Sequence, residues 1–130
     1  MKPIKVQVRF KDLDVYGHVN ESIYYQYMLQ ARWELLKNEF DKELLKTLLI
    51  VVAHSECTYK QPITTEDFVY ISVGLGDIGK KSFTLVYNIF NADKLYAVGK
   101  TTLVCFDAKT SKTIEIPNWL KEKLQELGNE

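Results

Sequence analysis

The segment from Arg9 to Met28 holds the residues whose types and spacing could carry out chemistry. It places Asp14, Gly17, His18 and Asn20 directly before a stretch with helical periodicity. A helix N-terminus presents unpaired N–H groups and about half a positive charge. Such a corner can hold a carbonyl oxygen as negative charge develops on it, while a carboxylate stands beside the carbonyl carbon. The pattern is therefore compatible with chemistry at a carbonyl group in which Asp14 takes part.

The same residues also have a purely structural interpretation. Asp12 and Asp14 are typical turn formers, and Asn20 is a good N-cap for the helix that follows. His18 can be a hydrogen-bonded residue at a strand-to-helix junction. Spacing alone favours this structural interpretation, so both stay open at this point.

Other chemical motifs are weak. Gly74–Gly79 fits the dinucleotide pattern G-x-G-x-x-G, but the pattern requires a helix after it, and the next residues, KKSFTLVYNIF, alternate as a strand does. A glycine-rich hairpin is the better interpretation. The two histidines and two cysteines are not clustered at ligand spacing, so we expect no metal and no cofactor.

Composition limits the class of protein. The 130 residues fit a single domain, 1–130, and the 17 basic and 17 acidic residues cancel. This balance does not favour a nucleic-acid partner, and no apolar run is long enough for membrane insertion. The N-terminal residues lack the apolar stretch of a signal peptide, so we expect a cytoplasmic protein. Cys57 and Cys105 lie in strand-like runs and are expected to be reduced.

Three segments are predicted to be helical. The longest runs from Glu21 to about Asn38 and is expected to begin at an Asn20 cap. Its apolar positions are Tyr24, Tyr27, Met28, Ala31 and Leu35. Asp41–Leu49 predicts a short helix capped by Asp41, and Pro117–Leu127 a final amphipathic helix.

Alternating patterns predict five strands. Their segments are Ile4–Asp12, Ala53–Lys60, Phe68–Leu75, Ser82–Phe90 and Leu95–Asp107. We expect Phe10 on the apolar face of the first strand and a hairpin turn at residues 91–94. In the last strand, one face is expected to carry Tyr96, Val98, Val104 and Phe106. Segregated strands with short turns indicate an antiparallel α+β fold with one long helix packed on a curved sheet.

The chemical segment resembles the signature of the 4-hydroxybenzoyl-CoA thioesterase-like branch of the hotdog-fold superfamily, R-[FY]-x-[DE]-x-D-x-x-G-H-V-N-x-x-x-Y-x-x-[YFW]. The matching residues are Arg9, Asp12, Asp14, Gly17, His18, Val19, Asn20, Tyr24 and Tyr27. Further elements of the family resemble Tyr59-Lys-Gln-Pro62 with Asp67, Lys80-Lys-Ser-Phe83, and Ile116-Pro117. The resemblance implies an α+β hotdog fold: an antiparallel curved sheet of about five strands wrapped around one long central helix.

The resemblance also implies catalytic roles. The second aspartate of D-x-D, Asp14, is expected to be the nucleophile or general base, and the backbone amide of Glu21 to polarise the thioester carbonyl. His18 and Asn20 complete the expected catalytic set, His18 in a supporting role. Related plant acyl-carrier-protein thioesterases carry an asparagine where this chain has Tyr16, so their mechanism does not transfer in full.

The implied substrate is an acyl-CoA thioester, with coenzyme A as part of the substrate rather than a cofactor. Its expected contacts are Tyr16, Gly17, Tyr24, Tyr59, Lys80, Lys81 and Ser82, the two lysines matching positions that contact coenzyme A phosphates. The two lysines also have a purely structural interpretation, as solvated charges at a hairpin. The family implies a homodimer, often paired into a homotetramer. The alternative functions are a hotdog hydratase or dehydratase and a non-catalytic acyl-CoA sensor.

Overall fold

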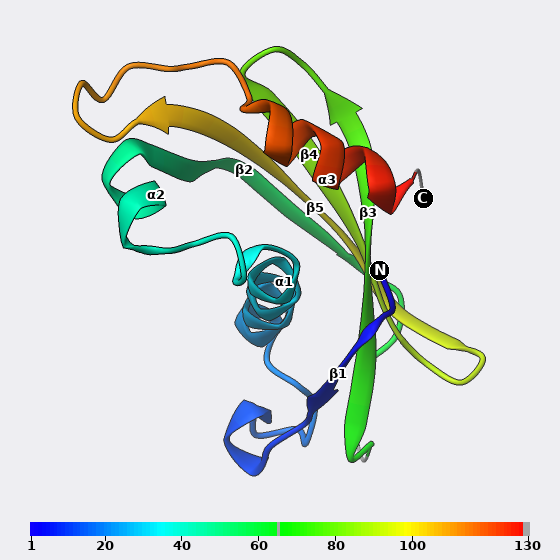
Figure 1. Cartoon of the computed structure of the whole chain (residues 1–130). Coiled ribbons are helices and arrows are strands. Elements are labelled where there is room, and N and C mark those ends of the chain that lie inside the picture. Colours follow the sequence, from blue (N-terminus) through cyan, green and yellow to red (C-terminus); the bar gives the residue numbers. More distant parts are fainter. Residues whose placement is uncertain (65, 129–130) are drawn as a thin grey trace.

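The structure is a computed structural model that describes residues 1–64 and 66–128. Within these residues the chain forms five strands, three α-helices and one 3-10 turn (Figure 1). The elements in chain order are β1 (Ile4–Gln7), η1 (Phe10–Asp12), α1 (Glu21–Leu36), α2 (Lys42–Thr47), β2 (Leu48–Tyr59), β3 (Phe68–Ile78), β4 (Ser82–Asn91), β5 (Lys94–Asp107) and α3 (Asn118–Leu127).

All five strands join one antiparallel sheet in the order β1-β3-β4-β5-β2. Strands β3, β4 and β5 follow one another as a meander. Asn91 pairs with Lys94 across a turn at Ala92 and Asp93, which confirms the predicted hairpin. Ala92 has a φ of 53°, a left-handed conformation that a tight two-residue turn requires. The short β1 and the long β2 form the two edges of the sheet.

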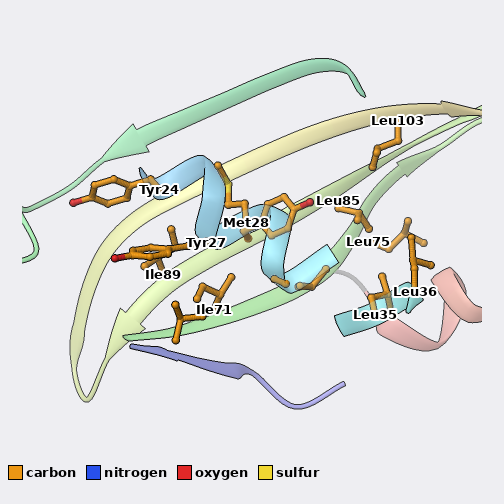
Figure 2. Close-up of a cluster of buried hydrophobic side chains, with 14 of the residues drawn as sticks. Tyr24, Tyr27, Met28, Leu35, Leu36, Ile71, Leu75, Leu85, Ile89 and Leu103 are labelled. Atoms are coloured by element: carbon orange, nitrogen blue, oxygen red, sulfur yellow. The ribbon is translucent and has the colours of Figure 1, made fainter. Parts of the chain in front are cut away.

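The sheet curves around α1, which Figure 1 shows almost end-on inside the curve. Side chains from α1 and from the concave face of the sheet form the core together (Figure 2). Buried residues on α1 are Tyr24, Tyr27, Met28, Ala31, Leu35 and Leu36, which confirms the predicted apolar face. The helix α3 closes the same core near the end of α1 through buried Leu120 and Leu124. The expected hotdog arrangement is therefore confirmed.

A glycine lies where the middle of α1 packs against the sheet. A Cβ atom added at Gly99 of β5 would lie 2.2 Å from Sδ of Met28, which is fully buried. Because there is no room for a methyl group, Gly99 allows the long helix to lie directly on the sheet. Met28 follows Tyr24 by one helical turn, so this contact also fixes the depth at which the first turn of α1 sits.

The first strand is shorter than predicted. It ends at Gln7, and Phe10 is 92% exposed instead of lying on a buried face. The physical reason is a local turn: the N–H of Asp12 donates to the carbonyl of Arg9 at 2.9 Å, and the N–H of Arg9 donates to the Asp12 carboxylate at 2.9 Å. These bonds close η1 and rotate Phe10 outward.

The face of β5 that packs on the core is not the predicted one but the opposite face. Val98, Val104 and Phe106 are only partly buried, and the core side consists of Ala97, Gly99, Thr101, Leu103 and Cys105. The prediction was wrong because a glycine and a threonine occupy this face, so the other face carries more apolar residues. Only Tyr96 is buried as expected.

Strand β2 begins at Leu48, earlier than the predicted Ala53, and the helix before it ends at Thr47. The apolar run from Leu48 to Val52 pairs with β5, and a bulge between Val52 and His54 interrupts the register. A short continuous apolar run does not distinguish strand from helix, so this boundary was misplaced. Asp41 caps the short helix as predicted: its side chain accepts a hydrogen bond from the N–H of Leu44.

The predictions for the glycine-rich segment and for the two cysteines agree with the structure. Residues 74–79 lie in β3 and in the turn that leads directly into β4, which confirms the glycine-rich hairpin and excludes the dinucleotide interpretation. Cys57 and Cys105 are free thiols. In the described part of the chain, no helix has both the length and the apolar character needed to cross a membrane.

Candidate active site

Asp14 lies in a short hairpin that connects the 3-10 turn to α1. The N–H of Asn20 donates to the carbonyl of Asp12 at 2.8 Å, Leu13 forms a bridge with Val19, and the N–H of Asp14 donates to the carbonyl of His18 at 2.7 Å. These three pairings hold Asp14 in a fixed place relative to the start of the helix.

Gly17 turns the chain at the tip of this hairpin. Its φ is 75°, and its N–H donates to the carbonyl of Asp14 at 3.0 Å. No neighbouring atom would contact a Cβ here, so the constraint on this position is the left-handed backbone and not space. Gly17 thus lets the chain reverse its direction three residues after Asp14.

The Asp14 carboxylate is oriented by backbone amides. Its Oδ1 accepts hydrogen bonds from the N–H of Tyr16 at 2.9 Å and the N–H of His18 at 3.2 Å. In the described chain, its Oδ2 accepts none. The side chain is half-buried and lines a cavity, so one carboxylate oxygen is anchored and the other is available to a ligand.

The N-terminus of α1 adjoins the same cavity. Asn20 is the cap, and its Oδ1 accepts a hydrogen bond from the N–H of Ser22 at 3.0 Å. The N–H of Ile23 donates to the Asn20 carbonyl at 2.9 Å. The N–H of Glu21, in contrast, has no acceptor among residues 1–64 and 66–128. It is an unpaired donor at the positive end of a 16-residue helix.

The cavity has a volume of about 580 Å³ and brings the predicted catalytic residues together. It is lined by Asp14, His18, Val19, Asn20, Glu21, Tyr24, Tyr59, Lys60, Gln61 and Pro62. A second cavity of about 590 Å³ runs along the outer face of α1 beside β1, and no carboxylate lines it. The first cavity therefore has both a carboxylate and a helix N-terminus, the two features that acyl-transfer chemistry needs.

Two tyrosines form the aromatic side of the cavity. The rings of Tyr24 and Tyr59 meet edge to face, with centroids 4.8 Å apart. The Tyr59 hydroxyl donates to the carbonyl of Glu21 at 3.1 Å, which ties β2 to the first turn of α1. Burial raises the pKa of both phenols above the usual value, so both remain neutral hydrogen-bond donors at neutral pH.

The structure does not bring every predicted contact residue to this cavity. Tyr16 is 81% exposed at the hairpin tip, and neither it nor Gly17 lines the cavity. Ser82 pairs with Val104 of β5, whereas Tyr59 pairs with Ala97. The seven residue-to-residue steps from Ala97 to Val104 span roughly 23 Å of strand.

The same separation applies to Lys80 and Lys81, which immediately precede Ser82 at the far end of the sheet. There, Nζ of Lys81 donates to Oγ1 of Thr113 at 3.3 Å, and the carbonyl of Lys80 accepts from the N–H of Ile116. Within one chain these three residues therefore do not share a site with Asp14.

Part of the cavity wall was not predicted from the sequence. Val19, Lys60, Gln61 and Pro62 line it but were not predicted as site residues. The signal was present for the last three, because the Tyr59-Lys-Gln-Pro62 element resembles a family motif at the end of a strand. Among the residues that the structure describes, no three His, Cys, Asp or Glu side chains lie together so as to hold a metal ion.

Known proteins resemble this chain over almost its whole length. The family model described as the thioesterase-like superfamily matches residues 8–124. The chain is 31% identical to the long-chain acyl-CoA thioesterase FadM of Escherichia coli (strain K12) over 127 residues, which covers 95% of this chain and 96% of FadM.

Solved structures show the same fold. The crystal structure of YbaW from Escherichia coli aligns with a TM-score of 0.84 and 30% identity, covering 96% of this chain and 97% of that one. A 1,4-dihydroxy-2-naphthoyl-CoA thioesterase from Synechocystis aligns with a TM-score of 0.85 and 19% identity, covering 96% of each chain. At this lower identity the likeness concerns the fold alone.

Replacing the cap residue tests whether the Asn20 side chain acts on the helix or on the substrate. We expect Asn20→Ala to lower the free energy of unfolding by about 1 kcal/mol, because the N–H of Ser22 loses its acceptor. Asn20→Ser, which retains a capping oxygen, is the matched control and should recover most of that loss. Chemical denaturation of the three proteins gives the comparison. Equal stability of the alanine and asparagine forms would contradict the capping role.

Proposed function

The chain belongs to the thioesterase-like superfamily and is a thioester hydrolase, and from this premise we propose that it hydrolyses an acyl-CoA thioester at the cavity beside the N-terminus of α1. In this proposal Asp14 supplies the catalytic carboxylate, and the N–H of Glu21 stabilises the oxyanion. The observation that carries the proposal is that both groups line one cavity, each with a free hydrogen-bonding position.

The chemistry needs only these two groups. A thiol with a pKa of about 8.5 leaves as a thiolate without a strong general acid. Attack on the carbonyl carbon converts its oxygen to an oxyanion, which the N–H of Glu21 and the positive helix end stabilise. The free Oδ2 of Asp14 either attacks the carbon itself, giving an anhydride that water then cleaves, or removes a proton from an attacking water.

Both routes demand a carboxylate whose orientation does not change. The two amide bonds to Oδ1 supply that constraint and leave Oδ2 without a hydrogen-bond partner among the described residues. His18 lines the cavity next to Asp14, which supports its proposed auxiliary role through its imidazole. The side chain of Asn20 contributes indirectly by capping the helix whose N-terminal amide binds the oxyanion.

For the acyl group we propose a long-chain fatty acid. This rests on the activity named for FadM, with which the chain aligns over almost its whole length. The aromatic wall of Tyr24 and Tyr59 supports an apolar acyl group, because its edge-to-face rings present carbon surface beside the catalytic corner. An acyl-CoA panel that includes long-chain, short-chain and aryl thioesters tests the assignment.

A second copy of the chain completes the site in this proposal. The edge strand β2 exposes Leu49, Val51 and Val52, each more than 40% accessible, along an unpaired row of backbone groups. Such an edge is a template for pairing with another strand. We therefore propose a homodimer in which two β2 strands pair antiparallel about a two-fold axis.

This pairing would also explain the distant lysines. Antiparallel β2 strands place the Leu48 end of one copy beside the Tyr59 end of the other. The Leu48 end adjoins the part of β5 that pairs with Ser82. Lys80, Lys81 and Ser82 of one copy would thus lie at the same end of the joined sheet as the cavity of the other, where the two lysines can bind coenzyme A phosphates.

Removal of the Asp14 charge tests the catalytic assignment. We expect Asp14→Asn to retain the melting temperature within a few degrees and to lower kcat at least ~10²-fold, the scale of losing a main catalytic group. The measurement is thiol release from the acyl-CoA panel, with wild type as reference. Near-wild-type turnover would remove Asp14 from the mechanism. An altered acyl chain without thiol release would indicate a hydratase, and binding without either change a sensor.

Sedimentation tests the second copy. We expect the wild type to sediment at twice the 15.1 kDa chain mass or a higher even multiple, and Val52→Asp at the chain mass with low activity. A charge on the exposed side of an edge strand opposes strand pairing, whereas the control, Val52→Ala, keeps the edge neutral. A fully active monomer would refute the shared site.

A further inference from the structure

One buried acidic side chain has no part in the proposed chemistry. Asp12 is 1% exposed and does not line the cavity that holds Asp14. Burying a carboxylate costs several kcal/mol unless good partners compensate. A charged group at such a place therefore calls for a physical explanation.

The hydrogen bonds of Asp12 join three separate pieces of the chain. Its Oδ2 accepts from the N–H of Arg9 at 2.9 Å, at the start of the 3-10 turn, and from the hydroxyl of Tyr27 at 2.9 Å, on the second turn of α1. Its main-chain carbonyl accepts from the N–H of Asn20, the helix cap, at 2.8 Å. One residue thus ties the end of the first sheet segment to both the cap and the body of α1.

The partners of Asp12 compensate only in part for the burial of its carboxylate. Its Oδ1 is buried and accepts no hydrogen bond from the described residues. Among these residues it forms an ion pair with the Arg9 guanidinium, whose Nη2 lies 3.7 Å away. The Arg9 side chain is 53% exposed, so solvent weakens this pair. Apolar residues of similar volume often stabilise a protein as much as a buried ion pair does. The arrangement is better suited to fixing a geometry than to adding stability.

The geometry that Asp12 fixes is that of the catalytic corner. Asp14 lies two residues after Asp12. Glu21 lies one residue after Asn20, whose N–H donates to the carbonyl of Asp12. The carboxylate and the oxyanion donor therefore extend from the same anchor along two short arms. Tyr27 holds this anchor from the core, where Figure 2 shows its ring among the buried side chains of the sheet and helix.

We propose that Asp12, held by the hydroxyl of Tyr27, is a positioning residue that sets the distance between the Asp14 carboxylate and the Glu21 amide. This rests on the proposed function. Burial and the bond to Asp12 raise the pKa of Tyr27, so its hydroxyl keeps its proton and remains a donor. A displacement of about 1 Å in a catalytic group can cost ~10²-fold in rate, so a loss of this anchor acts on turnover more than on binding.

The test compares two pairs of variants in the full-length protein. Tyr27→Phe removes only the donor to Asp12. Its matched control, Tyr87→Phe, removes a buried hydroxyl that contacts Arg32 and Thr101, and none of these three residues lines the cavity. We expect Tyr27→Phe to lower kcat about 10-fold with KM within about 2-fold of wild type, and Tyr87→Phe to change neither. Melting curves confirm that each protein is folded at the assay temperature.

The second pair separates positioning from acid–base chemistry. Asp12→Asn keeps an oxygen that can accept from Arg9 and Tyr27, so kcat should stay within about 5-fold of wild type. Asp12→Ala removes the acceptor, and kcat should fall about 10²-fold. If Asp12→Asn loses as much activity as Asp12→Ala, Asp12 acts through its charge and the positioning role is wrong.

The outcomes also separate this inference from the proposed function. Full kcat in Tyr27→Phe and in Asp12→Ala, together with an inactive Asp14→Asn, would overturn the positioning role and leave the catalytic assignment intact. An equal loss of kcat in Tyr27→Phe and Tyr87→Phe would reduce the effect to general destabilisation and overturn it as well. A wild-type protein that releases no thiol from any acyl-CoA would instead refute the proposed function.

Discussion

The structure depends on the pairing that closes residues 12–20 into a hairpin at the N-terminus of α1. Its bonds from Asn20 to Asp12 and from Asp14 to His18 are main-chain interactions, so they set the backbone positions before any side chain is considered. The helix contributes a fixed positive end, and the hairpin brings a carboxylate to it. Without this closure, Asp14 would be an ordinary surface acid in a mobile loop.

The rest of the fold keeps this corner rigid. A five-stranded sheet buries one face of α1, and Met28 against Gly99 sets how deeply the helix lies. The Tyr59 hydroxyl joins the sheet to the first helical turn at the carbonyl of Glu21. These contacts fix the first turn of α1 before any substrate binds, and a preorganised site of this kind avoids reorganisation at the moment of reaction.

Much of this arrangement could be predicted from the sequence, because strong periodicity and specific end signals coincide. The α1 pattern, the Asn20 cap and the turn at residues 91–94 were all predicted correctly. The errors have two causes. Local hydrogen bonds between Arg9 and Asp12 close a turn that the alternating pattern did not predict, and they turn Phe10 outward. Packing of α1 on Gly99 gives β5 a core face that carries fewer apolar side chains. In the proposed homodimer, the positions of Lys80 and Lys81 relative to the cavity would depend on association between copies, which local patterns do not encode.

In the proposed mechanism, the carbonyl of the thioester lies between the Asp14 carboxylate and the Glu21 amide. The most direct measurement is a crystal structure with a ketone analogue of acyl-CoA, in which a methylene between sulfur and carbonyl prevents cleavage. We expect the ketone oxygen within about 3.1 Å of the Glu21 nitrogen and the free Asp14 oxygen about 3–3.5 Å from the carbonyl carbon or from a water beside it. A carbonyl bound away from the helix N-terminus, with Asp14 out of reach, would contradict this mechanism.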